Sequence, residues 1–322
     1  MKAVRFHEHG GPEVLRYEDV GDPEPGEGDA LIRLSAVGVN FVDTYRRAGA
    51  YPVELPHLPG SEGAGEIVAL GPGVDGFAVG DRVMVSGGRG AYAELVVASA
   101  KRLVKLPEGF DEATAAALPT QGMTAHFLAT STYPLSDGDT CLIHAGAGGV
   151  GLLLIQIAKM RGARVITTVS TPEKAALARE AGADDVVLYT QDDFVAAVKR
   201  ITGGEMLPVV YDSVGKTTFD GSLDCLRPRG MLVLFGQASG AVAPLDPQVL
   251  NAKGSLFLTR PNLGHYTRTR EEFEERSGDL ISWAASGKLT VRIGERLPLS
   301  EAAEAHRRLE GRLTTGKVIL VP

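Results

Sequence analysis

Three glycines at a fixed spacing are the residues of this sequence best suited to bind a phosphate. Gly146, Gly148 and Gly151 form a G-x-G-x-x-G pattern that follows an apolar segment at 140–144 and precedes a segment with helical periodicity. In such a strand–turn–helix unit, glycines allow a tight turn and a close approach of backbone N–H groups to a pyrophosphate. The alternative is a glycine-rich turn that binds nothing. The context favours a dinucleotide-binding turn, whose predicted contacts are Gly146, Gly148, Gly149, Val150 and Gly151.

The end of the next predicted strand, VITTVSTPEK (165–174), bears on which dinucleotide would bind. Sites for NAD usually place an Asp or Glu here to bind the ribose 2′-hydroxyl. Ser170 and Thr171 stand at this strand end and Lys174 follows one helical turn later, so hydroxyls and an ammonium could receive a 2′-phosphate. Glu173 could be the ribose carboxylate, although an acid in the first turn of a helix also suits the helix dipole. The segment favours NADPH over NADH.

The elements that must position this turn change character along the chain. Up to about residue 120, short β-like segments alternate with turns rich in glycine and proline, which predicts a compact and mostly β domain. From Thr140 onward, six apolar segments are predicted as strands: TCLIH, RVITTV, DVVL, PVVYD, MLVLFG and SLFLT. Their alternation with helical segments predicts an α/β fold with a doubly wound, parallel, six-stranded Rossmann sheet. We expect the residues after Pro261 to rejoin the first domain, which leaves the active site between the two.

The helices that separate these strands are predicted from the spacing of their apolar residues. Helices are expected over roughly 149–161, from Pro172, from Asp192 and near Thr217. The apolar residues of the first helix recur at intervals of three and four, and therefore fall on one face that can pack on the sheet. They are Val150, Leu153, Leu154, Ile157 and Ala158.

The composition limits the kinds of partner that this chain can have. Its 322 residues include 33 basic and 40 acidic side chains without a long block of one sign, which argues against nucleic-acid and membrane-surface partners. No apolar run is long enough for a signal peptide or a membrane span. Cys141 and Cys225 are the two cysteines, which we interpret as buried thiols in a reducing cytoplasm. A cytoplasmic protein with a small-molecule partner is expected.

Further motifs run along the whole chain in a fixed order. They are GVNFVDTYRRAGAYP (38–52), LPGSEGAGEIVALGPGV (58–74), GDRV (80–83), LPTQGMTAHFL (118–128), HAGAGGVG (144–151), YDSVG (211–215), FGQASG (235–240) and LTRP (258–261). With these motifs the sequence resembles the quinone oxidoreductases, the zeta-crystallin-like branch of the medium-chain dehydrogenases/reductases. The resemblance implies a GroES-like catalytic domain of residues 1–119 and 262–322, and an NADPH-binding Rossmann domain of residues 120–261.

The same resemblance bears on metal binding. Zinc alcohol dehydrogenases of this superfamily carry a His as the second residue of the segment matching GSEGAGE, and a Cys in the segment matching GVNFVD. Here Ser61 stands at the first place, and Asn40 or a neighbour stands at the second. A catalytic zinc needs three protein ligands, and two cysteines cannot form a four-cysteine structural site. We therefore expect no metal.

Individual site residues follow from the family likeness. Asn40 and Tyr45 resemble residues beside the nicotinamide, where they would be catalytic, and Thr124 resembles the hydroxyl that contacts its ring or carboxamide. Asn40 could instead be an ordinary helix N-cap, and Tyr45 or Tyr51 could be packing aromatics. Lys174 and Tyr189 resemble residues near the adenosine 2′-phosphate, and Arg312 matches an arginine near the phosphate. Further cofactor contacts are expected at the carboxyl ends of the strands: Ser213, Phe235, Gly236, Ala238, Ser239 and Leu258.

The expected activity is the NADPH-dependent reduction of quinones or similar activated carbonyl compounds. A quinone is already electrophilic, so the protein needs chiefly to orient it and to offer a hydrogen-bond donor to the developing oxyanion. Hydride transfer and single-electron reduction both fit these residues. One alternative is an NADPH-dependent enone, alkenal or enoyl-thioester reductase. Another is a structural or sensing protein that binds NADPH with little turnover.

The last predicted strand bears on assembly. SLFLTR (255–260) is apolar and stands at the edge of the predicted sheet. Members of the family pair this edge across a two-fold axis, and an unpaired apolar edge strand is an aggregation risk. A homodimer that pairs this edge strand is therefore expected.

Overall fold

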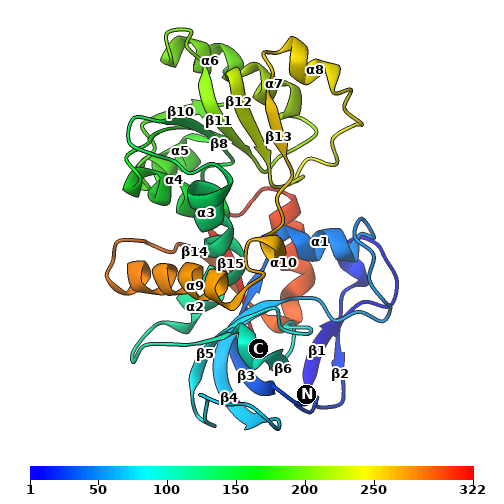
Figure 1. Cartoon of the computed structure of the whole chain (residues 1–322). Helices are drawn as coiled ribbons and strands as arrows, with labels where there is room; N and C mark the ends of the chain where they lie inside the picture. Colours follow the sequence, from blue (N-terminus) through cyan, green and yellow to red (C-terminus); the bar gives the residue numbers. More distant parts are fainter. The chain divides into compact units, whose positions relative to one another are not determined.

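The computed structural model describes residues 1–322, which divide into two compact units (Figure 1). The first unit contains Met1–Met123 and Thr269–Pro322, and the second contains Thr124–Arg268. No helix in the structure combines the length and the apolar character that a membrane span requires.

The second unit is built on a parallel six-stranded sheet with the strand order β10-β9-β8-β11-β12-β13. Every neighbouring pair is parallel, which confirms the predicted doubly wound Rossmann sheet. The strands are β8 (Thr140–His144), β9 (Arg164–Val169), β10 (Asp185–Leu188), β11 (Leu207–Asp212), β12 (Leu226–Leu234) and β13 (Phe257–Thr259).

Three strands have ends that differ from the sequence-based expectation. β11 begins one residue early, at Leu207, and β12 begins five residues early, at Leu226. β12 ends at Leu234, so that Phe235 and Gly236 lie in the loop that follows it. β13 begins two residues late, at Phe257, because Gly254 and Ser255 both have positive φ angles and form a turn. The edge strand of the sheet is therefore only three residues long.

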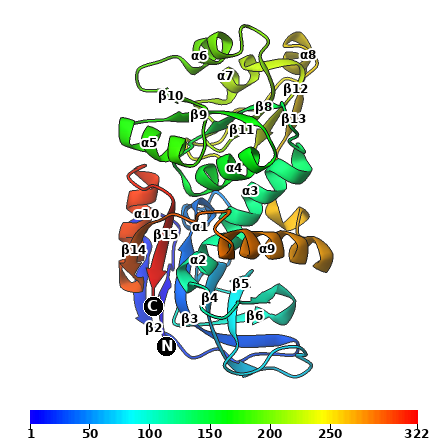
Figure 2. The ribbon, with the colours of Figure 1, turned by 90° about the vertical axis from the view of Figure 1, so that its left-hand side faces the viewer.

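Helices cover this sheet on both of its faces, as the two views show (Figures 1 and 2). Of the five residues predicted to form the apolar face of α4, Leu153, Leu154, Ile157 and Ala158 are buried, and Val150 is only partly buried. Residues of α6 and α7 form a separate core with Leu142 of β8 and its neighbours. The helical segments are α3 (Met123–Phe127), η4 (Leu128–Thr132), α4 (Gly149–Met160), α5 (Pro172–Glu180), α6 (Phe194–Ile201), α7 (Phe219–Asp224), α8 (Gln248–Ala252) and η5 (Leu263–His265).

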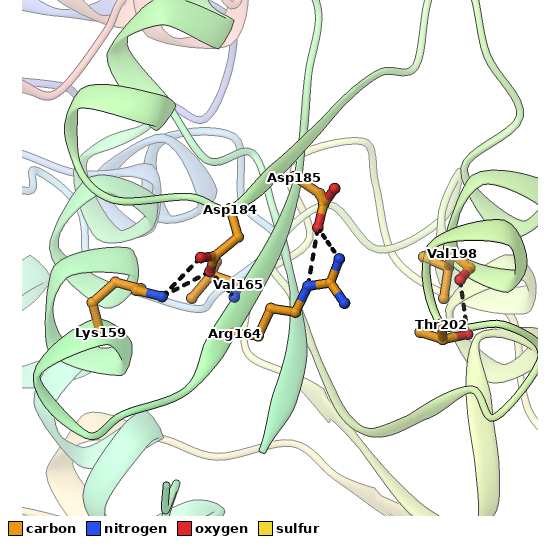
Figure 3. Close-up of polar contacts among 7 residues, drawn as sticks. All are labelled: Lys159, Arg164, Val165, Asp184, Asp185, Val198 and Thr202. Atoms are coloured by element: carbon orange, nitrogen blue, oxygen red, sulfur yellow. Dashed lines mark hydrogen bonds and ion pairs between the residues drawn. The ribbon is translucent and has the colours of Figure 1, made fainter. Parts of the chain in front are cut away.

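Charged side chains link the elements at the amino ends of β9 and β10 (Figure 3). Lys159 of α4 donates to both oxygens of Asp184 at 2.8 and 2.9 Å, and Asp184 also accepts the Val165 N–H at 2.7 Å. Arg164 pairs with Asp185 at 2.9 Å. Because these contacts lie at the amino ends of the strands, they leave the carboxyl ends free for loops and ligands.

The first unit contains a seven-stranded sheet and a two-stranded sheet. The carboxyl-terminal strand β15 pairs antiparallel with β3, with Val318 opposite Val39 and Leu320 opposite Val37. The mostly β character expected of this unit is confirmed. Its strands are β1 (Lys2–Arg5), β2 (Arg16–Asp19), β3 (Asp29–Val39), β4 (Glu62–Leu70), β5 (Arg82–Ser86), β6 (Leu95–Ser99), β7 (Leu103–Lys105), β14 (Ile293–Pro298) and β15 (Lys317–Val321).

The helices of the first unit are short, apart from α9. They are η1 (Pro12–Val14), α1 (Phe41–Arg47), η2 (Ala100–Arg102), α2 (Glu112–Ala117), η3 (Leu118–Gly122), α9 (Arg270–Ala285), η6 (Leu299–Glu301) and α10 (Ala302–Glu310). Cys141 in β8 and Cys225, directly after α7, are buried and free, as the interpretation of both as thiols requires.

Candidate functional site

The turn between β8 and α4 requires glycine at two of its positions for packing. A Cβ atom on Gly146 would overlap the side chain of Thr167, and one on Gly151 would overlap the Ala145 carbonyl oxygen. At Gly148 the nearest atom to such a Cβ would be the Ala145 oxygen at 3.2 Å, a much milder contact. A Cβ atom at position 148 would still be closer to the backbone than most real Cβ atoms are, although it would meet no other atom within 4 Å.

Gly148 is also the N-cap residue of α4, and it provides no side chain to satisfy the first N–H groups of the helix. The first N–H groups of a helix have no partner within the helix. With the positive end of the helix dipole they form an anion-binding site. The turn can thus hold a phosphate through backbone donors at Gly149, Val150 and Gly151.

The loops after β11 and β12 lie side by side at the carboxyl edge of this sheet. The Ala238 N–H donates to the Ser213 carbonyl oxygen at 3.1 Å, and the Ser239 N–H donates to Val214 at 2.8 Å. A Cβ atom on Gly236 would overlap the backbone of Ser213, so the close approach needs glycine. The structure therefore brings together five of the predicted cofactor contacts: Ser213, Phe235, Gly236, Ala238 and Ser239.

A buried carboxylate that the sequence analysis did not identify holds the loop after β11. Asp212 accepts the N–H groups of Val214 and Gly215 at 2.8 and 2.9 Å, and the hydroxyls of Thr218 and Ser222 at 2.7 and 2.8 Å. Several donors satisfy the buried charge, which fixes the backbone of the loop. The motif YDSVG contains this residue, but its sequence does not show which donors meet it.

His144 extends this network to the strand beside it. Its ring nitrogens lie 2.8 Å from the Thr168 hydroxyl and 3.0 Å from the Ser222 hydroxyl. Burial lowers the pKa of His144, so the ring is neutral and bridges β8, β9 and α7. His144 thus supports the strand ends without carrying charge toward a ligand.

The predicted 2′-phosphate residues gather at the end of β9. The Thr190 hydroxyl donates to the Ser170 carbonyl oxygen at 3.0 Å, and Tyr189 bonds Val169 through its N–H at 3.1 Å. The Thr171 hydroxyl caps α5 by accepting the N–H of Lys174. These contacts place Ser170, Tyr189 and Lys174 in one region of the second unit.

Glu173 is engaged at the start of α5. A hydrogen bond from the Thr171 hydroxyl, together with one from its own backbone N–H, lowers the pKa of the Glu173 carboxyl. A carboxylate held in this way satisfies the helix terminus. This supports the interpretation of Glu173 as a helix-terminal acid over a ribose ligand.

In the first unit, Asn40 is the N-cap residue of α1, as the alternative interpretation held. Its side-chain amide is nevertheless bonded to two buried charged groups. Asn40 Oδ1 accepts from Lys317 Nζ at 2.9 Å, and Asn40 Nδ2 donates to Glu62 Oε1. Lys317 Nζ also lies 2.5 Å from Glu62 Oε1, which completes a closed group of three side chains.

Helix α1 is polar on the face that it buries. Asp43, Thr44 and Arg47 are buried, whereas Phe41 and Tyr45 are only partly buried. The Tyr45 ring lies 6.1 Å from the Phe41 ring and 5.6 Å from the Tyr51 ring, so these aromatics contact one another as the packing interpretation expects. Their partial exposure also leaves ring surface for a ligand.

A chain of hydrogen bonds runs beneath α1. Arg47 Nη1 lies 3.0 Å from His306 Nδ1, His306 Nε2 lies 3.0 Å from the Tyr92 hydroxyl, and that hydroxyl donates to Asp43 at 3.4 Å. A guanidinium can only donate, so His306 accepts at Nδ1 and carries its proton on Nε2. Tyr92 therefore accepts from His306 and turns its own proton toward Asp43.

Asp43 stands at the end of this chain with one oxygen satisfied. Its Oδ2 accepts the Asn40 N–H at 3.0 Å, while its Oδ1 is buried without a hydrogen-bond partner. Burial raises the pKa of Asp43 from 3.8 to about 6, against the opposing effect of the Asn40 N–H. The carboxyl group therefore titrates near neutral pH.

Three other predicted site residues lie in different elements. Thr124 is partly buried in α3, and Leu258 is partly buried in the edge strand β13. Arg312 is exposed after α10 and has a positive φ angle of 58°. Asn40, Tyr45 and Arg312 belong to the first unit, and the remaining predicted residues belong to the second.

The two segments that carry zinc ligands in zinc alcohol dehydrogenases contain Ser61 and Asn40 in this chain. Ser61 precedes β4, and the Asn40 oxygen binds the Lys317 ammonium. A positively charged lysine in contact with a candidate ligand opposes the binding of a second cation. No group of three or more His, Cys, Asp or Glu side chains in the structure is arranged to hold a metal ion.

Comparison with known proteins assigns the family. Residues 26–108 match the model for the alcohol dehydrogenase GroES-like domain, and residues 149–283 match the model for zinc-binding dehydrogenases. A quinone oxidoreductase from Pseudomonas aeruginosa is 47% identical over 323 residues, covering 100% of this chain and 99% of the relative. The chain belongs to the quinone oxidoreductase family. The resemblance seen in its motifs is thereby confirmed, as is the expectation of an oxidoreductase.

Other members of the family are similar over their whole length. A 2-haloacrylate reductase from a Burkholderia species is 43% identical over 330 residues, covering 100% of this chain and 99% of the relative. The crystal structure of Escherichia coli quinone oxidoreductase complexed with NADPH is 43% identical to this chain. Its TM-score is 0.98, and each chain is covered in full.

The raised pKa of Asp43 gives a pH-dependent prediction. Because the folded protein holds this proton more tightly, the stabilisation from the neutral carboxyl is complete below pH 3.8 and is lost as the pH rises through about 6. We expect Asp43→Asn to raise the free energy of unfolding by about 2–3 kcal/mol at pH 7.5. The gain should disappear near pH 4 in thermal melts across this range.

Asp81 provides a control in which the pKa is shifted in the opposite direction. A hydrogen bond from the Lys105 ammonium lowers the pKa of Asp81, so Asp81→Asn should destabilise the protein at pH 7.5. A melting temperature of Asp43→Asn below that of the wild type at pH 7.5 would contradict the assignment of a costly buried charge to Asp43.

Proposed function

We propose that this chain is an NADPH-dependent quinone reductase that works without a metal. The observation that carries the proposal is the closed group of Asn40, Glu62 and Lys317. The Lys317 ammonium binds the Asn40 side chain in the segment where the zinc enzymes of the superfamily carry a cysteine ligand, which favours polarisation of the acceptor by hydrogen-bond donors. Membership of the quinone oxidoreductase family supports the same activity.

The residues present fit NADPH as the cofactor. The turn from Gly146 to Gly151 would hold the pyrophosphate, and Ser170, Lys174 and Tyr189 would receive the 2′-phosphate. The Escherichia coli relative, whose structure is a complex with NADPH, supports this choice. When bound, NADPH supplies the hydride. Thr124, Leu258, Arg312 and the paired loops at Ser213 and Phe235–Ser239 are proposed as further contacts.

Tyr45 is the best candidate for the donor to the acceptor oxygen. The Asn40 amide already donates one N–H to Glu62 and accepts a hydrogen bond from Lys317. Tyr45 stands on the partly exposed face of α1, with the rings of Phe41 and Tyr51 beside it. We propose that a planar quinone lies against this aromatic surface, while the Tyr45 hydroxyl donates to its developing oxyanion. Asn40 would contact the nicotinamide with its remaining N–H.

A second candidate function is the reduction of an activated carbon–carbon double bond. It is favoured by the 43% identical relative that is named a 2-haloacrylate reductase. Such a reaction needs the same hydride and also a proton delivered to carbon. The Tyr45 hydroxyl could serve either reaction, so the side chains of α1 do not separate the two.

We also propose a homodimer that pairs the edge strand β13. Phe257 in this strand is 56% exposed although its neighbour Leu256 is buried. An exposed apolar edge strand favours pairing with a second copy. The two buried free cysteines suit a reducing cytoplasm.

Steady-state oxidation of NADPH tests the proposed function. We expect the purified protein to oxidise NADPH with simple 1,4-quinones, and to do so equally well after exhaustive dialysis against a chelator. Turnover with 2-enones, 2-haloacrylates or enoyl thioesters but not with quinones would favour the second function. NADPH binding without turnover on any acceptor would indicate a binding protein instead.

The preference for NADPH has its own test at Lys174. A hydrogen bond or ion pair to a charged phosphate contributes about 1.5–3 kcal/mol, or roughly 10–100-fold in affinity. We expect Lys174→Gln to lower kcat/KM for NADPH by this factor and to leave kcat/KM for NADH nearly unchanged. Lys199→Gln, on the surface of α6, is the matched control. An equal loss with both dinucleotides would remove Lys174 from the 2′-phosphate site.

A further inference from the structure

Glu62 is a fully buried carboxylate to which the proposed function assigns no contact with substrate or cofactor. It lies at the start of β4, at 0% exposure, directly after the Ser61 that replaces a zinc-ligand histidine of the zinc enzymes. A carboxylate buried in this way needs charge compensation and several hydrogen bonds. Both of its oxygens receive them.

The donors to Glu62 come from three distant parts of the chain. Oε1 accepts from the Asn40 amide and from the Lys317 ammonium, the latter at 2.5 Å. Oε2 accepts the backbone N–H of Thr120 at 2.6 Å. The sequence separations are 22, 255 and 58 residues, so one carboxylate joins α1, β15 and η3.

The surrounding backbone makes room for this carboxylate. A Cβ atom on Gly38 would overlap Glu62 Oε1 and also approach the Ala116 carbonyl oxygen at 2.8 Å. Gly38 lies in β3, two residues before Asn40. One segment therefore provides both the space for the Glu62 carboxylate and the Asn40 side chain that binds it. The arrangement is therefore built into the backbone of the first unit.

The pair of opposite charges also determines how the Asn40 amide faces. Its oxygen must face the ammonium, which has only donors, and its nitrogen must face the carboxylate, which has only acceptors. A flip of the amide would place its NH2 group against the ammonium and its oxygen against the carboxylate, and neither pair can form a hydrogen bond. The second N–H of Asn40 and the second lone pair of its oxygen therefore also have a fixed orientation.

We propose that Glu62, with Lys317 as its counter-ion, is a positioning residue for the reduction. It orients the Asn40 amide and, through the Thr120 N–H, the backbone of the LPTQGMT segment that ends at Thr124. This inference rests on the proposed function, because Asn40 and Thr124 are proposed nicotinamide contacts. Glu62 itself touches neither substrate nor cofactor in this account.

A double-mutant cycle between Glu62→Gln and Asn40→Ala tests the proposal with quinone and NADPH. If Glu62 acts through Asn40, Glu62→Gln should lower kcat by about 10-fold or more in the wild type, and by less than about 3-fold in Asn40→Ala. KM for NADPH should change little. An unchanged kcat, or the same loss in both backgrounds, would overturn the proposal.

Stability needs a separate control, because Glu62→Gln leaves the Lys317 charge unpaired. Glu310→Gln breaks another ion pair of the first unit, the 2.7 Å contact with the buried Arg47. It should lower the melting temperature without changing kcat. If Glu62→Gln fails to fold, the pair Glu62→Gln/Lys317→Met removes both charges and can replace it in the cycle, with the same expected losses.

A readout without turnover separates this inference from the proposed function. In isotopically labelled protein, the Asn40 side-chain amide protons should exchange slowly in the wild type and in Glu310→Gln, and quickly in Glu62→Gln. Slow exchange in Glu62→Gln would overturn the proposal even in an active enzyme. If exchange is fast in Glu62→Gln but the wild type reduces no acceptor, the orientation of Asn40 by Glu62 is supported and the proposed function is refuted.

Discussion

The buried carboxylate of Glu62 is the constraint on which the first unit's candidate site depends. A charge at 0% exposure is stable only where donors surround it, so the segments that supply those donors cannot move independently. Asn40, Thr120 and Lys317 are therefore held by one group. The Lys317 ammonium beside Asn40 also opposes the binding of a second cation at this place.

The second unit also contains a buried carboxylate that is surrounded by hydrogen-bond donors. Asp212 gathers backbone and hydroxyl donors around one buried carboxylate, which fixes the loop that carries Ser213. His144, held neutral by burial, ties that loop to the neighbouring strands. In both units, buried carboxylates fix loops and helix ends, and the residues proposed to meet a ligand stand beside them. Asp43 adds a charge that burial disfavours, a cost often associated with functional positions.

Local patterns in the sequence predicted most of the fold. The G-x-G-x-x-G turn, the six parallel strands and the buried face of α4 follow from spacing over a few residues, and the structure confirms them. Glu62 and Lys317 were missed because they meet across 255 residues, and nothing in either local segment shows that one side chain compensates the other. Asp43 could not be identified from the sequence, since only the folded protein shows its burial and its unpartnered oxygen. Asn40 was predicted from the family likeness, but its charged partners Glu62 and Lys317 could not be predicted in the same way.

A crystal structure of the protein grown with NADPH and excess zinc, with anomalous data at the zinc edge, tests the central claim most directly. The account predicts the pyrophosphate at the turn from Gly146 to Gly151. It also predicts the Lys317 ammonium between Asn40 and Glu62, with no zinc peak beside them. A zinc ion bound at Asn40 or Glu62 with Lys317 displaced, or a dinucleotide bound away from the turn, would contradict it.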